Sequence, residues 1–86
     1  MEVEVGKITH FFSHLNVGII EVTHGDLKIG DKVHMKGHTT DFFQEIDSMQ
    51  KEHASVDSAR GGESVGIKVK SPVREHDLVF KVLAEP

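Results

Sequence analysis

Histidine has the widest range of chemistry in this sequence, because imidazole binds metals and titrates near neutral pH. A metal site needs three or four converging ligands, often at a recognisable spacing and with carboxylate support. The seven histidines are instead scattered along the chain, at His10, His14, His24, His34, His38, His53 and His76. We therefore expect structural or surface histidines and no metal site. A histidine-based metal-binding or pH-responsive module is the weakest of three functional hypotheses.

A serine hydrolase is the second chemistry that the residue types permit. Ser13 with His14, or Ser48 with His53, can be combined on paper with Asp41 as nucleophile, base and orienting acid. Nothing around either serine builds a nucleophile elbow or an oxyanion hole. The sequence therefore predicts no catalytic residues, no cofactor and a protein that is not an enzyme.

Basic side chains form the third candidate site. Lys68 and Lys70 are two residues apart, so on a strand they project from the same face. Arg74 follows shortly after, and Lys36 joins them if its strand is a neighbour. Lysine and arginine contact phosphate backbones without reading sequence. We predict that Lys68, Lys70, Arg74 and Lys36 form a binding surface, and the alternative is a solvated sheet face.

Composition and charge restrict these functions. The 86 residues form one domain, 1–86, and their formal net charge of -4 argues against a general nucleic-acid binder. Any phosphate contact must therefore be local. The chain has no cysteine, its acidic start does not resemble a signal peptide, and no apolar run reaches the ~20 residues of a membrane span. We expect a cytoplasmic protein without a membrane partner.

Alternating apolar and polar residues predict strands along most of the chain, and no window of about 11 residues has a helical period. We expect strands over 3–12, 17–22, 32–36, 42–50, 64–70 and 78–83, and a single helical turn at 57–60. A phase slip at Gly6-Lys7 indicates a bulge. The pattern favours an all-β fold, a small closed or nearly closed barrel of about six or seven strands, because closure removes exposed edges.

The same alternation predicts which apolar side chains are buried. The paired residues Phe42 and Phe43 lie on opposite faces of one strand, so one should point inward and one outward. The expected core consists of Val33, Ile46, Val65, Ile67, Val69 and Phe80.

Several motifs resemble a known family of β-barrels. The segments 6–8 (GKI) and 27–33 (LKIGDKV), followed by Gly37, are similar to the second domain of translational GTPases. The segments 37–44, 48–53, 65–69 and 73–77 more closely resemble the C-terminal barrel of collagenase-like peptidases and small stand-alone elongation factor-like proteins. One departure is His76, where the pattern usually has glycine before Asp77. We expect a different turn there, because histidine tolerates a positive φ poorly.

The resemblance implies a non-catalytic binding module associated with translation or RNA, with ribosomal RNA or tRNA as its partner. It implies no GTP binding by this chain, which lacks a phosphate-binding loop. The alternative that it leaves open is a protein–protein adaptor, or an accessory subunit of a collagenase-like peptidase partner. The salt dependence of binding distinguishes RNA binding from a protein–protein contact, because phosphate contacts weaken steeply with ionic strength and an apolar interface does not.

Overall fold

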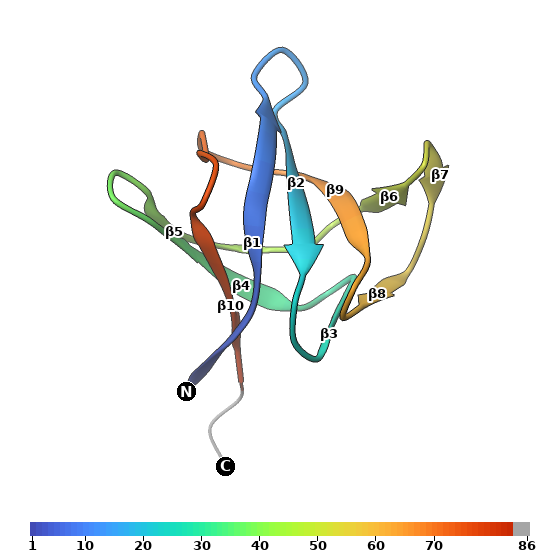
Figure 1. Ribbon diagram of the computed structural model, residues 1–86, viewed down its shortest axis with the longest axis horizontal. Coiled ribbons are helices and arrows are strands. Elements are labelled where there is room, and N and C mark those ends of the chain that lie inside the picture. The colour runs from blue at the N-terminus through green and yellow to red at the C-terminus, as the bar shows by residue number, and fades with distance from the viewer. Residues whose placement is uncertain (84–86) are drawn as a thin grey trace.

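The computed structural model describes residues 1–83, and these residues form antiparallel strands curled around one core (Figure 1). The ten strands of this region are β1 (Glu2–Phe12), β2 (Val17–Val22), β3 (Asp26–Lys28), β4 (Lys32–Lys36), β5 (Asp41–Glu45), β6 (Met49–Lys51), β7 (Ala54–Ser55), β8 (Ser58–Arg60), β9 (Ser64–Lys68) and β10 (Leu78–Val82). The all-β prediction is confirmed. The predicted number of six or seven strands is too low.

Two predicted elements account for part of this difference. The strand expected over 42–50 is interrupted after Glu45, and its two parts pair with different neighbours, β5 with β4 and β6 with β9. The helical turn expected at 57–60 is instead strand β8, which pairs with β3. Segments this short carry too few residues for their periodicity to reveal a change of partner.

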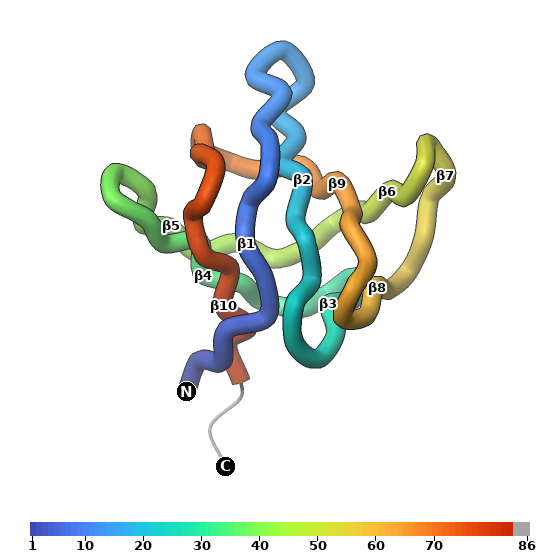
Figure 2. Tube along the Cα trace, viewed as in Figure 1, coloured from blue at the N-terminus to red at the C-terminus, as the bar shows by residue number. Residues whose placement is uncertain are grey.

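Eight strands form one sheet in the order β5-β4-β10-β1-β2-β9-β6-β7, and β3 and β8 form a separate pair. Within residues 1–83 this sheet is open, with β5 and β7 at its edges. The closed barrel that we expected is therefore not confirmed. The tube in Figure 2 shows how the sheet bends around, so that the segment between β5 and β6 passes behind β1 and β2.

A side chain spans part of the gap between β5 and the end of β9. The buried amide of Gln44 donates a hydrogen bond of 2.8 Å to the carbonyl of Lys68 and accepts one of 2.8 Å from the N–H of Lys70. These two bonds satisfy backbone groups that a neighbouring strand would otherwise pair. They connect β5 to the end of β9 at a point where these two strands form no ladder.

The predicted irregularity near Gly6 is a β-bulge in β1. Glu4 pairs with Phe80 and Gly6 with Val79, so one residue of β1 has no partner in β10. A Cβ at Gly6 would lie 2.4 Å from the carbonyl oxygen of Glu21. Glycine is required here because β1 and β2 approach each other too closely for a side chain.

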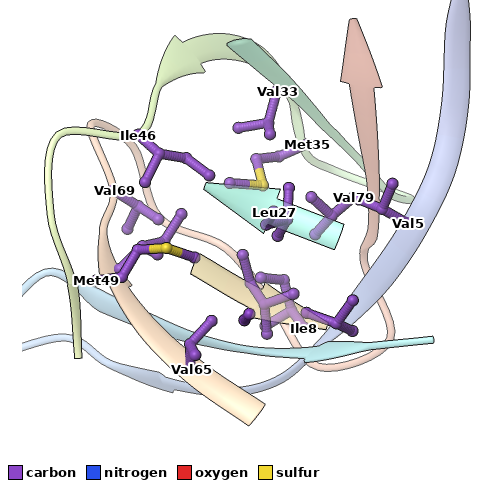
Figure 3. Close-up of a cluster of buried hydrophobic side chains, with 14 of the residues drawn as sticks. Val5, Ile8, Leu27, Val33, Met35, Ile46, Met49, Val65, Val69 and Val79 are labelled. Carbon is purple, nitrogen blue, oxygen red and sulfur yellow. The ribbon is translucent and has the colours of Figure 1, made fainter. Parts of the chain in front are cut away.

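The core lies inside the curled sheet, and Figure 3 shows its aliphatic side chains pointing toward one another. Five of the six predicted core residues are buried, namely Val33, Ile46, Val65, Ile67 and Val69. The prediction was wrong for Phe80, which is partly exposed, whereas its neighbour Val79 is fully buried. Both faces of β10 carry apolar residues, so alternation alone could not indicate which face points inward.

The turn before β10 differs from the expectation for His76. Its φ is 76°, in the left-handed region that glycine normally occupies. Its N–H donates to the carbonyl of Ile8, and the carbonyl of Asp77 accepts from the N–H of Ile8, both at 2.8 Å. The turn therefore keeps the glycine-type conformation, held by β1.

Residues 1–83 include no helix of the length and apolarity that a membrane crossing requires.

Candidate docking surface

An apolar groove lies on the outer side of the sheet, between the β1–β2 hairpin and the β6–β7 turn. It encloses about 430 Å³ and is lined by Phe12, Leu15, Val17, Ile19, Gln50, Glu52, His53 and Gly66. Phe12 is 44% exposed and Leu15 is 59% exposed. In Figure 1 the β1–β2 hairpin and the β6–β7 turn both rise on the side away from the start of β1. A concave apolar surface between two projecting hairpins has the character of a protein contact site.

Strand β2 supplies the floor of this groove because it is apolar on both faces. Gly18, Ile20 and Val22 face the core, whereas Val17 and Ile19 face outward and remain partly exposed. The outward pair lies against Gly66 of β9, where an added Cβ would be 3.2 Å from Val17 and 3.3 Å from Ile19. Apolar residues on both faces are typical of a covered central strand. Here residues 1–83 cover the outer side chains of β2 only in part.

The rim of the groove contains two residues in an unfavourable conformation. Glu52 and His53 form the turn between β6 and β7 with φ of 50° and 67°. A two-residue hairpin turn with both φ positive normally contains asparagine, aspartate or glycine. Lys51, directly before the turn, is ion-paired with Glu63. Strained backbone is concentrated at functional sites, so this turn is consistent with a contact surface.

The predicted basic residues are all exposed, and they come from separate segments of the chain. Lys68 ends β9 opposite Val17, and Lys70 follows it beyond the strand. Lys36 lies in β4, between Leu78 of β10 and Asp41 of β5. Arg74 lines a separate hollow. Their role as a binding surface stays a prediction, because exposure is also what a solvated face shows.

Histidine 34 is a feature that sequence reasoning missed. When its buried imidazole is protonated, Nδ1–H donates to Glu2 Oε1 at 2.8 Å and Nε2–H donates to Asp41 Oδ1 at 2.5 Å. The ring stacks on Phe43 with centroids 4.1 Å apart. Of the predicted phenylalanine pair, Phe42 packs on the core and Phe43 points outward, as expected.

The two carboxylates determine the ionisation of His34. Burial disfavours the charged imidazole, but hydrogen bonds to Asp41 and Glu2 outweigh it, so the pKa of His34 is raised above its ordinary value. The hydrogen bond from His34 lowers the pKa of Asp41. The cluster therefore joins β1, β4 and β5 as an ion-paired unit. Glu2 and His34 are distant in sequence, so no local pattern could have revealed this contact.

No arrangement for serine catalysis is found in residues 1–83. The Asp41 carboxylate binds His34, and Ser13 lies beside His14 with 3.5 Å between Oγ and Nδ1. Segment 62–66 reads Gly-x-Ser-x-Gly, but Ser64 begins β9 and pairs with Glu21. A nucleophile elbow requires a strand-to-helix turn, which is not present there. Over the same residues, no group of three or more metal-ligating side chains converges.

The fold is that of a known domain. A crystal structure of the C-terminal domain of a putative U32 peptidase from Geobacillus thermoleovorans superposes with a TM-score of 0.85 at 22% identity, covering 92% of this chain and 91% of that one. The selenomethionine variant of that domain gives a TM-score of 0.84 at 21% identity. These two structures establish the class of fold.

Sequence comparison points to proteins of the same kind. An uncharacterised protease of Methanocaldococcus jannaschii is 41% identical over 80 residues, which cover 92% of this chain. A collagenase of Porphyromonas gingivalis is 33% identical over 81 residues, and another collagenase from that species is 35% identical over 78. The chain spans only about a fifth of the length of these relatives. No protein-family model matches the chain.

These comparisons correct the function expected first. The chain matches the C-terminal domain of collagenase-like U32 peptidase proteins, so the association with translation or RNA is wrong. The narrower resemblance, to the C-terminal domain of collagenase-like peptidases, is confirmed. The broader resemblance to the second domain of translational GTPases is not shown. The alternative function, a peptidase-associated domain, fits better.

Proposed function

We propose that this chain is a non-catalytic module that docks onto the catalytic chain of a collagenase-like peptidase through the apolar groove. The observation that carries the proposal is the outer face of β2, where Val17 and Ile19 form a partly exposed apolar floor. Burying such a surface against a partner contributes roughly 25 cal/mol for each Å² of apolar area removed from water. The relatives support the occupant, because they are named as proteases or collagenases and extend well beyond the matched segment.

The groove and its rim are suited to a preformed docking site. The β1–β2 hairpin is paired along Phe11–Gly18 and Phe12–Val17, and the N–H of Leu15 closes its turn by donating to the carbonyl of Phe12. A few residues carry most of the binding energy in typical interfaces, and an aromatic or aliphatic anchor often supplies it. Phe12 and Leu15, both exposed in the lining of the groove, are suited to this role.

Photo-crosslinking tests the docking proposal directly. A photoreactive amino acid is placed at Leu15 in cells that make this chain, and the crosslinked protein is identified by mass spectrometry. The matched control is Ile29, an aliphatic residue that is 44% exposed and does not line the groove. We expect a collagenase-like peptidase chain crosslinked from Leu15 and not from Ile29. Equal crosslinking from both positions, or a Leu15 partner unrelated to peptidases, would overturn the proposal.

Affinity measurements with the captured peptidase chain provide a second test. Leu15→Ser should weaken binding by at least about tenfold, whereas Ile29→Ser should not. Binding should change little as salt is raised, because the contact is apolar. The isolated 86-residue chain should not cleave gelatin. Cleavage that disappears in Ser64→Ala would show that the chain is catalytic.

A further inference from the structure

A second hollow, separate from the groove, lies where the β4–β5 turn meets the segment before β10. It encloses about 420 Å³ and is lined by Thr39, Thr40, Asp41, Phe42, Ser71, Pro72 and Arg74. From this lining we infer that the hollow binds a peptide carboxylate, with the guanidinium of Arg74 as the charged contact. The inference goes beyond the proposed docking function and uses a different surface.

The charge at this hollow favours a monoanion. Arg74 is the cationic side chain of the lining, and no hydrogen bond or ion pair to its guanidinium is found within residues 1–83. A guanidinium is planar and presents paired N–H donors that match a carboxylate. Among residues 1–83, the only carboxylate that lines the hollow is Asp41, which is already paired with His34 at 2.5 Å. Arg74, the single cation of this lining within the described residues, balances a carboxylate but not a dianionic phosphate.

The hydroxyl groups and apolar side chains of the lining can contact the rest of a peptide that carries the carboxylate. Thr39 and Ser71 place hydroxyl donors in the same lining as Arg74. Phe42, packed partly on the core, and Pro72 supply apolar contact beside them. Sites for small ligands combine apolar walls with a few polar groups that orient the ligand. The hollow is larger than a carboxylate alone needs, so it has space for the adjoining residues.

The walls of the hollow are held in place before any ligand binds. The N–H of Arg74 donates to Asp77 Oδ2 at 2.8 Å, and the N–H of Asp77 donates to the carbonyl of Arg74 at 3.1 Å. On the opposite wall, the carbonyl of Thr40 accepts from the N–H of Gly37 at 2.8 Å. Preorganised contacts reduce the entropy that binding costs. Figure 1 shows the β4–β5 turn and the segment before β10 on the same side of the molecule.

The test follows amide chemical shifts of the 86-residue chain by NMR while three short peptides are added. The first is N-acetyl-Gly-Phe-Pro with a free carboxylate, the second is its C-terminal amide, and the third is N-acetyl-Gly-Glu-Pro amide, whose only carboxylate is a side chain. We expect saturable shifts at residues 39–42 and 71–74 with the first or third peptide and none with the second. The responding peptide tells whether a chain terminus or an acidic side chain is the ligand.

Variants of the two exposed arginines complete the test. Arg74→Gln should weaken peptide binding at least about tenfold, which is the magnitude of one charge-assisted hydrogen bond. Arg60→Gln removes a positive charge of the same type outside the hollow and should leave binding unchanged. Any one of three results would overturn the inference. The amidated second peptide gives shifts equal to those of the others, none of the three peptides gives saturable shifts, or Arg74→Gln binds peptide as well as wild type does. None of these results depends on a peptidase partner.

Discussion

His34 and Asp41 are joined by a hydrogen bond of 2.5 Å between Nε2 and Oδ1, from adjacent strands of the sheet. Glu2 of β1 contacts the other ring nitrogen at 2.8 Å, and Phe43 and Phe80 contact the ring. This cluster lies on the outer face of β4, opposite Val33 and Met35, which face the core. It gives β4 buried residues on both faces and links the first strand of the chain to the sheet edge.

The His34 cluster predicts how stability depends on pH. Its folded-state pKa is raised, so its stabilising contribution is full below the unfolded value of about 6.5 and is lost as pH rises through the higher folded value. The pKa of Asp41 is lowered, so this carboxylate affects stability in the acidic range. Its stabilising contribution is full above its unfolded pKa of 3.8 and is lost as pH falls through its lower folded pKa. Urea unfolding should show wild type more stable than His34→Gln near pH 6, with the difference shrinking by about pH 9. His38→Gln, at an exposed position, is the control, and a difference that grows with pH would contradict this assignment.

The core predicts a graded response to truncation. Ile67 and Val79 are almost fully buried, so Ile67→Ala should cost about 2–4 kcal/mol of unfolding free energy. Phe80 is only partly buried, so Phe80→Ala should lower the free energy of unfolding by less than the size of the side chain suggests. Denaturant unfolding of Ile67→Ala, Val79→Ala and Phe80→Ala measures this order. A loss at Ile67 of only a few tenths of a kcal/mol would be inconsistent with the inward face of β9.

The left-handed backbone at His76 predicts a stabilising substitution. A non-glycine residue in this region costs about 1–2 kcal/mol, and glycine restores part of that at the expense of a more flexible unfolded chain. His76→Gly should therefore raise the free energy of unfolding by about 0.5–1 kcal/mol. His14→Gly, at an exposed turn residue without positive φ, should not stabilise the protein. A fall in stability of His76→Gly would indicate that the imidazole makes a favourable contact.

Gly37 and Asp77 predict a steric conflict. A Cβ at Gly37 would lie 1.8 Å from Oδ1 of the buried Asp77, whose Oδ2 accepts from the N–H of Arg74. Gly37→Ala must displace this carboxylate and should cost about 1–3 kcal/mol or more. Gly61→Ala is the control, because its nearest contact would be 3.6 Å away. Thermal unfolding of the two variants distinguishes them, and equal melting temperatures would mean that Asp77 moves without cost.

Zinc should have little effect on this protein. Any ligand that binds the folded chain alone raises its melting temperature by mass action, so one equivalent of zinc tests for a site. Because no convergent ligand set is found in residues 1–83, we expect the melting temperature to stay nearly constant. Stabilisation by several degrees would reveal a site formed by the histidines.

The sequence by itself was sufficient for the all-β class and for most of the core. Alternation places Val65 and Ile67 of β9, and Val69 just beyond it, on one face, and this inference is local because side-chain direction in a strand has a period of two. Glycine at a phase slip likewise indicated the bulge in β1. The resemblance to the C-terminal domain of collagenase-like peptidases came from short motifs spread along the whole chain.

Only the tertiary structure decided which faces of two-sided apolar strands are buried. In β10 it buries Val79 rather than Phe80, and in β2 it leaves Val17 and Ile19 partly exposed on the outer face. Local sequence contains the same apolar residues in either case, and only the curl of the sheet determines which side encloses the core. The contacts of His34 with Glu2 and of Gln44 with Lys70 join residues that are 32 and 26 positions apart. Such pairs depend on strand order, which short-range periodicity does not encode.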